Sequence, residues 1–137
     1  NYREEDFVAA VKEATGGKGA NVILDMVGGS YVDRNYDAAA VEGRIVQIAT
    51  QGGAVASADI SKIMVKRLVH TGSTLRPRTV EFKGQVAAGL ESQVWPLLAT
   101  RRVAPVMDMI FPLNDAWRAH ERMEEGEHVG KIVLDVG

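Results

Sequence analysis

Cysteine is absent from this sequence of 137 residues. Its absence excludes disulfide bonds, cysteine zinc sites and thiol nucleophiles. A basic surplus is missing too, because 18 acidic residues against 16 lysines and arginines give a formal net charge of −2. Neither nucleic acid nor an anionic membrane is therefore an expected partner. No apolar run is long enough to span a bilayer, and we expect a cytoplasmic protein.

Motifs that carry chemistry are also few. The sequence contains no Gly-x-Gly-x-x-Gly phosphate fingerprint and no nucleophile elbow. Its three histidines, His70, His120 and His128, are scattered and have no carboxylate at metal-ligand spacing, so no metal site is predicted. His120 falls on the apolar face of an expected helix, and we expect it to be packed and hydrogen-bonded.

The stretch Ala20–Gly29 is the most informative part of the chain. Its apolar run Val22–Leu24 is continuous rather than alternating, which predicts a parallel strand buried on both faces. The pair Gly28–Gly29 then allows a tight turn at the carboxyl end of this strand. Open α/β sheets bind their ligands at that edge, so the candidate site should lie there.

Helical and strand patterns alternate along the chain. Helices are expected at about residues 3–15, 30–41, 59–66, 79–100 and 115–125, and further strands at 44–49, 67–75, 105–111 and 130–136. This order predicts an α/β fold, a partial Rossmann-type parallel sheet with helices on both faces, followed by a C-terminal strand–helix–strand tail. The polar middle of segment 67–75 favours an edge position, and Pro96 should kink or restart the longest helix.

Two glycine-bearing loops, Val27–Gly29 and Thr50–Gly53, follow neighbouring strands and should face one crevice. Backbone without a Cβ can approach a planar cofactor closely; alternatively, these glycines only supply the positive φ of two turns. Asp25 could bind a ribose, but a structurally hydrogen-bonded acid at the strand end is favoured. Arg76 and Arg78 either meet a phosphate or lie in a solvated turn, and the second is favoured.

Several segments together resemble the medium-chain dehydrogenase/reductase superfamily. They are residues 1–7, 20–29, 43–49, 94–99, 111–120 and 130–134. The most similar branch is that of the NADPH:quinone oxidoreductases, zinc-free relatives of alcohol dehydrogenase. Fragments of a zinc-type alcohol dehydrogenase or of an enoyl reductase are alternatives within this class. A non-catalytic half-Rossmann dimerisation module and a methyltransferase-like fold that binds S-adenosylmethionine are alternatives outside it.

The resemblance implies the carboxyl-terminal half of an enzyme. Residues 1–101 would complete a Rossmann cofactor-binding domain, and residues 102–137 would return to a GroES-like substrate domain that the chain lacks. The chain begins at Asn1 without an initiator methionine, and we expect a fragment that is inactive alone. The full-length enzyme would transfer a hydride from NADPH to a quinone or enone, and would form a homodimer through the strand near Leu68–Leu75.

The same resemblance implies a set of residues that contact NADPH. They are Tyr2, Val27, Gly28, Ala49, Thr50, Gln51, Ser73, Thr74 and Leu75. Tyr2 would lie against the 2′-phosphate, and the preference for NADPH over NADH depends on it. Val27 and Gly28 would lie under the adenine ribose and pyrophosphate. Ala49–Gln51 would line the nicotinamide ribose, and Ser73–Leu75 would lie near the carboxamide. No catalytic residue is expected in this part of the enzyme.

Overall fold

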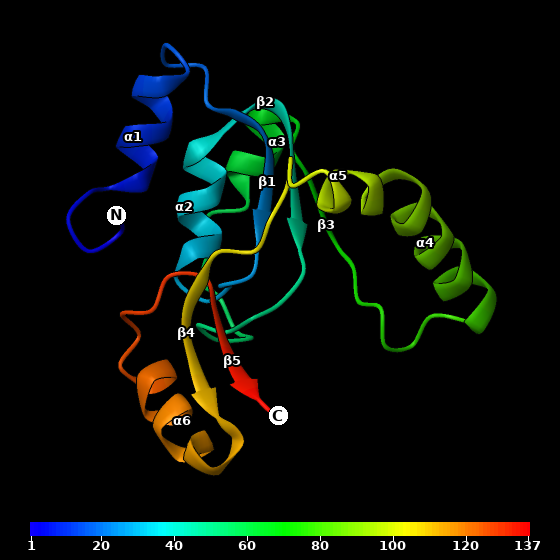
Figure 1. The fold of residues 1–137 in the computed structure, drawn as a ribbon. Coiled ribbons are helices and arrows are strands. Elements are labelled where there is room, and N and C mark those ends of the chain that lie inside the picture. Colours follow the sequence, from blue (N-terminus) through cyan, green and yellow to red (C-terminus); the bar gives the residue numbers. More distant parts are fainter. The chain divides into compact units, whose positions relative to one another are not determined.

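The computed structural model describes residues 1–137 and divides into two compact units, Asn1–Arg78 and Thr79–Gly137. The first unit contains a parallel sheet in the order β1-β2-β3 (Figure 1). Its elements are α1 (Phe7–Ala14), β1 (Ala20–Asp25), α2 (Tyr31–Ala38), β2 (Ala39–Gln47), α3 (Ser61–Lys66) and β3 (Val69–Gly72). The predicted α/β class with a partial Rossmann-type parallel sheet is confirmed, and β3 lies at an edge as expected.

Helix α1 starts later than predicted and is bound to α2 by an aromatic and ionic cluster. Asp6 caps the helix, because its carboxylate accepts the backbone amide two residues further on at 3.0 Å. Arg34 binds the same carboxylate at 2.8 Å, which lowers the pKa of Asp6. The Arg34 guanidinium lies 4.4 Å from the centre of the Phe7 ring, and Phe7 stacks on Tyr31 at 5.3 Å.

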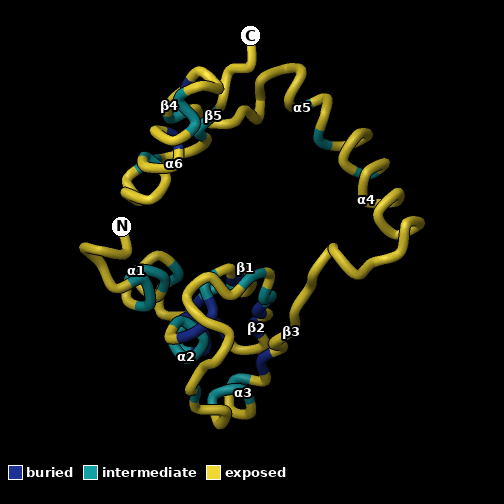
Figure 2. The backbone as a smooth tube through the Cα atoms, turned by 90° about the horizontal axis from the view of Figure 1, so that it is seen from below, coloured by how far each residue is buried: buried dark blue, intermediate teal, exposed yellow.

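The core of the first unit lies between the sheet and helices α2 and α3. Tyr36 of α2 and Ile45 of β2 are buried together, with Ile23 of β1 packed against them. Figure 2 shows buried stretches of the backbone in α2 and β2. The opposite face of β1 carries Val22 and Leu24, which are 66% and 62% exposed. The predicted burial of this strand on both faces is therefore wrong for this unit, because its helices α2 and α3 cover only the face of Ile23 and Ile45.

Helix α2 ends at Ala38, three residues before its predicted end at residue 41, and β2 begins at once. Lys66 of α3 explains why α2 ends at this position. Its Nζ donates to the carbonyl oxygens of Tyr36, Asp37 and Ala39 at 2.6, 2.9 and 2.9 Å. Burial of the amine lowers the pKa of Lys66. The side chain thus satisfies carbonyls that continued helix would have bonded.

The second unit begins with α4 (Val80–Gln93) and α5 (Trp95–Ala99). Pro96 lies in the first turn of α5, where a missing N–H needs no partner, so the predicted restart of the helix is confirmed. A parallel pair of strands follows, β4 (Met107–Pro112) and β5 (Lys131–Asp135), connected by a short 3₁₀ turn and α6 (Ala116–Glu124). His120 of α6 is exposed, so the expectation that it is packed is wrong; Ala119 is the buried residue of this helix.

Asp108 connects three parts of the second unit. Its two carboxylate oxygens accept bonds from Arg122 of α6 at 3.0 and 3.2 Å. The backbone amide of Val129, just before β5, donates to the same carboxylate at 3.2 Å. The Arg122 guanidinium, followed by the Val129 amide, holds the pKa of Asp108 below its usual 3.8.

Acid unfolding of the second unit should therefore depend on Asp108. Because the pKa of Asp108 is lower in the folded state, its stabilisation is present above about pH 4 and is lost as the pH falls through the folded value. Asp108→Asn is expected to lower the urea midpoint at neutral pH and to flatten its decline between about pH 4 and pH 2. Tryptophan emission measures this, since Trp95 and Trp117 both lie in the second unit. Equal pH slopes in both proteins would contradict the assignment.

The predicted domain division between residues 101 and 102 stays a prediction, while the compact units of the structure meet at Arg78. None of the helices combines the length and the apolar character that crossing a bilayer requires.

Candidate functional site

The loops that follow β1 and β2 are joined by main-chain hydrogen bonds. The amide of Gln51 donates to the carbonyl of Met26 at 3.1 Å, and the amide of Gly52 donates to the carbonyl of Val27 at 2.7 Å. The predicted meeting of the two glycine-bearing loops at one edge of the sheet is thereby confirmed.

The glycines of these loops are required by the contact between them. Gly28 and Gly29 have φ values of +67° and +51°. A Cβ at Gly28 would lie 2.8 Å from the carbonyl oxygen of Gly53, and one at Gly29 would lie 2.5 Å from that of Gly52. The space that these glycines leave is filled by the neighbouring loop. Of the two alternatives, the structure therefore favours turn geometry over close approach of a ligand.

Asp25 organises the turn after β1 from inside the protein. It is 4% exposed, and its carboxylate accepts bonds from the amides of Val27 and Gly28 at 2.6 and 3.1 Å. The side-chain amide of Asn35 on α2 donates to its second oxygen at 3.0 Å. All of these donors belong to the protein itself. The structure therefore agrees with the favoured role of Asp25, that of a structurally hydrogen-bonded acid, rather than with ribose binding.

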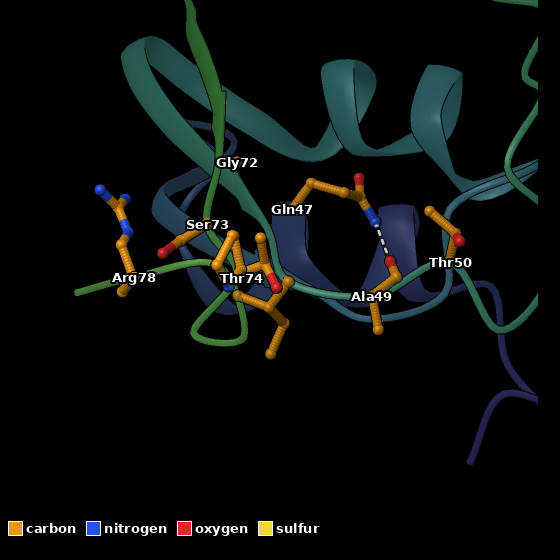
Figure 3. Close-up of a pocket in the computed structure, with 9 residues that line it drawn as sticks. Gln47, Ala49, Thr50, Gly72, Ser73, Thr74 and Arg78 are labelled. Atoms are coloured by element: carbon orange, nitrogen blue, oxygen red, sulfur yellow. Dashed lines mark hydrogen bonds between the residues drawn. The ribbon is translucent and has the colours of Figure 1, made fainter. Parts of the chain in front are cut away.

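A pocket of about 500 Å³ opens at the carboxyl ends of β2 and β3 (Figure 3). It is lined by Gln47, Ile48, Ala49, Thr50, Gly72, Ser73, Thr74, Pro77 and Arg78. Four of these were predicted from the resemblance: Ala49 and Thr50 from the loop after β2, and Ser73 and Thr74 from the segment after β3. The structure brings these two segments together because parallel neighbours end at the same edge of a sheet.

The chemistry of this lining suits a nucleotide. Thr50, Ser73 and Thr74 contribute hydroxyl groups, which can both donate and accept hydrogen bonds. Arg78 contributes a guanidinium, and no acidic residue lines the pocket. Hydroxyls beside apolar surface match the sugar and amide groups of a nicotinamide nucleotide, and a guanidinium matches its phosphates.

The other predicted residues lie outside this pocket. Tyr2 lines a separate pocket beside α1 and is 70% exposed. Val27 lines a cavity between α1, α2 and β1, whereas Gly28 lines one that also includes Thr50. Gln51 and Leu75 are exposed and line none of these pockets. The structure therefore assembles part of the predicted set and leaves the cofactor roles of all nine residues as predictions.

Two side chains near the pocket have no signal in the local sequence. Gln47 ends β2 and lines the pocket, and its side-chain amide binds main-chain carbonyls. His70 of β3 lines the cavity that also contains Gly28 and Thr50, and its Nδ1 lies 2.8 Å from the hydroxyl of Tyr36. Burial raises the pKa of that tyrosine. Only the register of three strands brings these side chains to the site, and a single-strand pattern does not contain that register.

The chain contains no group of three or more histidine, cysteine or acidic side chains arranged to hold a metal ion. Residues 1–134 match the family described as zinc-binding dehydrogenase. This chain belongs to that family.

Relatives within the family support the resemblance inferred from the sequence. Quinone oxidoreductase 1 of Escherichia coli K12 is 29% identical over 136 residues, which are 98% of this chain and 41% of that protein. The structure of Escherichia coli quinone oxidoreductase complexed with NADPH has a TM-score of 0.74 at 30% identity, over 98% of this chain and 42% of that one. A structure of an NAD-dependent alcohol dehydrogenase has a TM-score of 0.73 at 27% identity, over 100% of this chain and 37% of that one.

Membership of the medium-chain dehydrogenase/reductase superfamily, in its quinone oxidoreductase branch, is thereby confirmed. The chain corresponds to the carboxyl-terminal half of such proteins and spans about two-fifths of the length of these relatives.

Proposed function

We propose that this zinc-binding dehydrogenase chain forms part of an NADPH-dependent reductase that transfers a hydride to a quinone or enone. The observation that carries the proposal is the pocket at the ends of β2 and β3, where two predicted cofactor-binding segments meet. The likeness to a quinone oxidoreductase whose structure contains NADPH supports the choice of cofactor and acceptor.

In this proposal the residues of the chain bind and orient the reactants. Thr50 lies on the side of the nicotinamide ribose, and Ser73 and Thr74 lie beside the carboxamide. When bound, the dihydronicotinamide supplies the hydride, and a proton from solvent completes reduction of the quinone to the hydroquinone. No acid or base of the chain is assigned a catalytic role, so positioning and exclusion of water are its contribution.

The direct test is quinone-dependent oxidation of NADPH by the full-length protein that contains this chain, with menadione as acceptor. We expect turnover with NADPH, slower turnover with NADH, and none from the isolated 137-residue chain. Oxidation of NADPH that does not depend on a quinone or an enone would refute the proposed acceptor. Turnover by the isolated chain would refute the expected inactivity of the fragment.

Ser73 provides a matched test of the pocket. Ser73→Ala is expected to raise KM for NADPH roughly three- to tenfold with little change in kcat, because one hydrogen bond to the cofactor is lost. Ser92→Ala is the control, since Ser92 lies on α4 and its hydroxyl bonds only the carbonyl of Gly89, in its own helix, at 3.2 Å. The same KM in both variants would place the cofactor elsewhere.

An alcohol dehydrogenase is the second candidate, and its support is the likeness to the NAD-dependent enzyme. It predicts NAD⁺-dependent oxidation of simple alcohols and metal in the purified full-length protein. An enoyl reductase would instead reduce an enone with NADPH and leave menadione untouched. Running both acceptors and an alcohol on the same preparation therefore separates these activities.

Homodimerisation through the strand near Leu68–Leu75 also belongs to the proposal. Its support is the edge position of β3, whose four residues are all exposed. Sedimentation at several concentrations tests it: we expect a dimer, and a monomer at high concentration would overturn it. A dimer without nucleotide affinity would instead favour a non-catalytic assembly module.

A further inference from the structure

Gln47 is placed to hold both walls of the candidate pocket. In the sheet it lies opposite Asp25 of β1 and Gly72 of β3, where all three strands end. Its main-chain carbonyl accepts a hydrogen bond from the amide of Ser73 at 3.0 Å, which fixes the wall that follows β3.

The side chain of Gln47 fixes the other wall. Its Nε2 donates to the carbonyl oxygen of Ala49 at 2.6 Å and to that of Asp25 at 3.3 Å (Figure 3). A carbonyl can only accept, so two carbonyls require the nitrogen of the amide to face them. The orientation of this side chain is thereby determined, and its Oε1 points away from Ala49.

The bond to Ala49 holds the chain that directly follows β2 against the Gln47 side chain. The next residue, Thr50, lines both the pocket with Ser73 and the neighbouring cavity with Gly28. Gln47 lines both cavities as well. The path of the Thr50 loop between the two cavities is therefore set by one side-chain amide, in addition to the main-chain bonds between the loops.

We propose that Gln47 is a positioning residue for the nucleotide pocket, an inference that rests on the proposed function. Its amide holds the Ala49 carbonyl and so keeps Thr50 on one wall, while its own carbonyl holds Ser73 on the opposite wall. A pocket whose walls are ordered before binding loses less conformational freedom when the nucleotide enters. Gln47 thus contributes to affinity without donating a bond to the reacting atoms.

Kinetics of the full-length protein test the inference. Gln47→Met keeps the length of the side chain and removes both donated bonds, so we expect KM for NADPH to rise roughly three- to tenfold while kcat changes less than about twofold. Gln47→Glu should raise KM further, because a carboxylate would face two carbonyl oxygens. Gln85→Met is the control, since Gln85 is exposed on α4. A purely structural role would lower the melting temperature and leave KM unchanged.

Amide hydrogen exchange without nucleotide separates this inference from the proposed function. The amides of Gln51 and Gly52 should exchange faster in Gln47→Met by roughly three- to tenfold. Absence of NADPH binding by the wild-type protein would refute the proposed function, while the exchange rates would still test the positioning role. Unchanged exchange in a folded Gln47→Met protein would overturn that role.

A second variant covers the case in which Gln47→Met does not fold. Gln47→Lys should then fold and show the wild-type KM, because its ammonium can donate to both carbonyls. Failure of that rescue would also overturn the positioning role.

Discussion

Asp25→Ala is expected to lower the free energy of unfolding by about 3 kcal/mol, because three donors lose a buried acceptor. These donors are the amides of Val27 and Gly28 and the side chain of Asn35. Each belongs to the turn after β1 or to α2, and at 4% exposure of Asp25 water has little access to replace the carboxylate. Urea unfolding followed by circular dichroism measures the loss.

A pair of substitutions distinguishes this structural role from ribose binding. Asp25→Asn should be destabilising because one of its oxygens, now an amide nitrogen, would face the amide nitrogen of Asn35. Adding Asn35→Asp restores an acceptor there and should recover roughly half of the loss. If Asp25→Ala instead costs less than about 0.5 kcal/mol and abolishes NADPH binding by the full-length protein, the ribose role is correct.

The sequence predicted the layout of the site through two elementary patterns. Alternating helical and strand periodicity gave the parallel sheet, and the carboxyl ends of parallel strands meet at one edge. That rule placed Thr50 beside Ser73 although 23 positions separate them, and the structure puts both in one pocket. The glycines after β1 and β2 likewise marked two turns at that edge.

What the sequence did not predict depends on contacts between distant segments. The continuous run Val22–Leu24 shows that a strand is apolar, but it does not show which element covers each face. Helix α2 ends where Lys66 binds its last carbonyls, and that residue lies 27 positions beyond Ala39. The orientation of the Gln47 amide follows from the register of β1, β2 and β3. Such contacts are properties of the assembled sheet rather than of a local pattern.

The sequence predicted the position of the glycine loops correctly but left open two explanations for their glycines. Gly28 and Gly29 were expected either to admit a cofactor or to form a turn. The structure fills their missing Cβ positions with the loop after β2, so the same glycines that mark the site also build its supporting wall. Substitution at Gly29 separates the two explanations.

Gly29→Ala is expected to lower the free energy of unfolding by about 3 kcal/mol, from a strained backbone and a main-chain clash. The φ of +51° disfavours a side chain at this position by about 1–2 kcal/mol. The new Cβ would lie 2.5 Å from the carbonyl oxygen of Gly52, and a backbone atom cannot rotate away as a side chain can. The loop after β2 must therefore move, which should also speed amide exchange at Gly52.

Gly84→Ala is the control for the Gly29 substitution. Gly84 lies inside α4 with nothing within 4 Å of its Cβ position, so alanine there should stabilise the chain by about 0.5–1 kcal/mol through higher helix propensity. Opposite signs for the same chemical change would show that loop contact, and not the loss of glycine itself, destabilises the first unit. If Gly29→Ala leaves stability and exchange unchanged but weakens NADPH binding by the full-length protein, the glycine admits the cofactor and the loop contact is secondary.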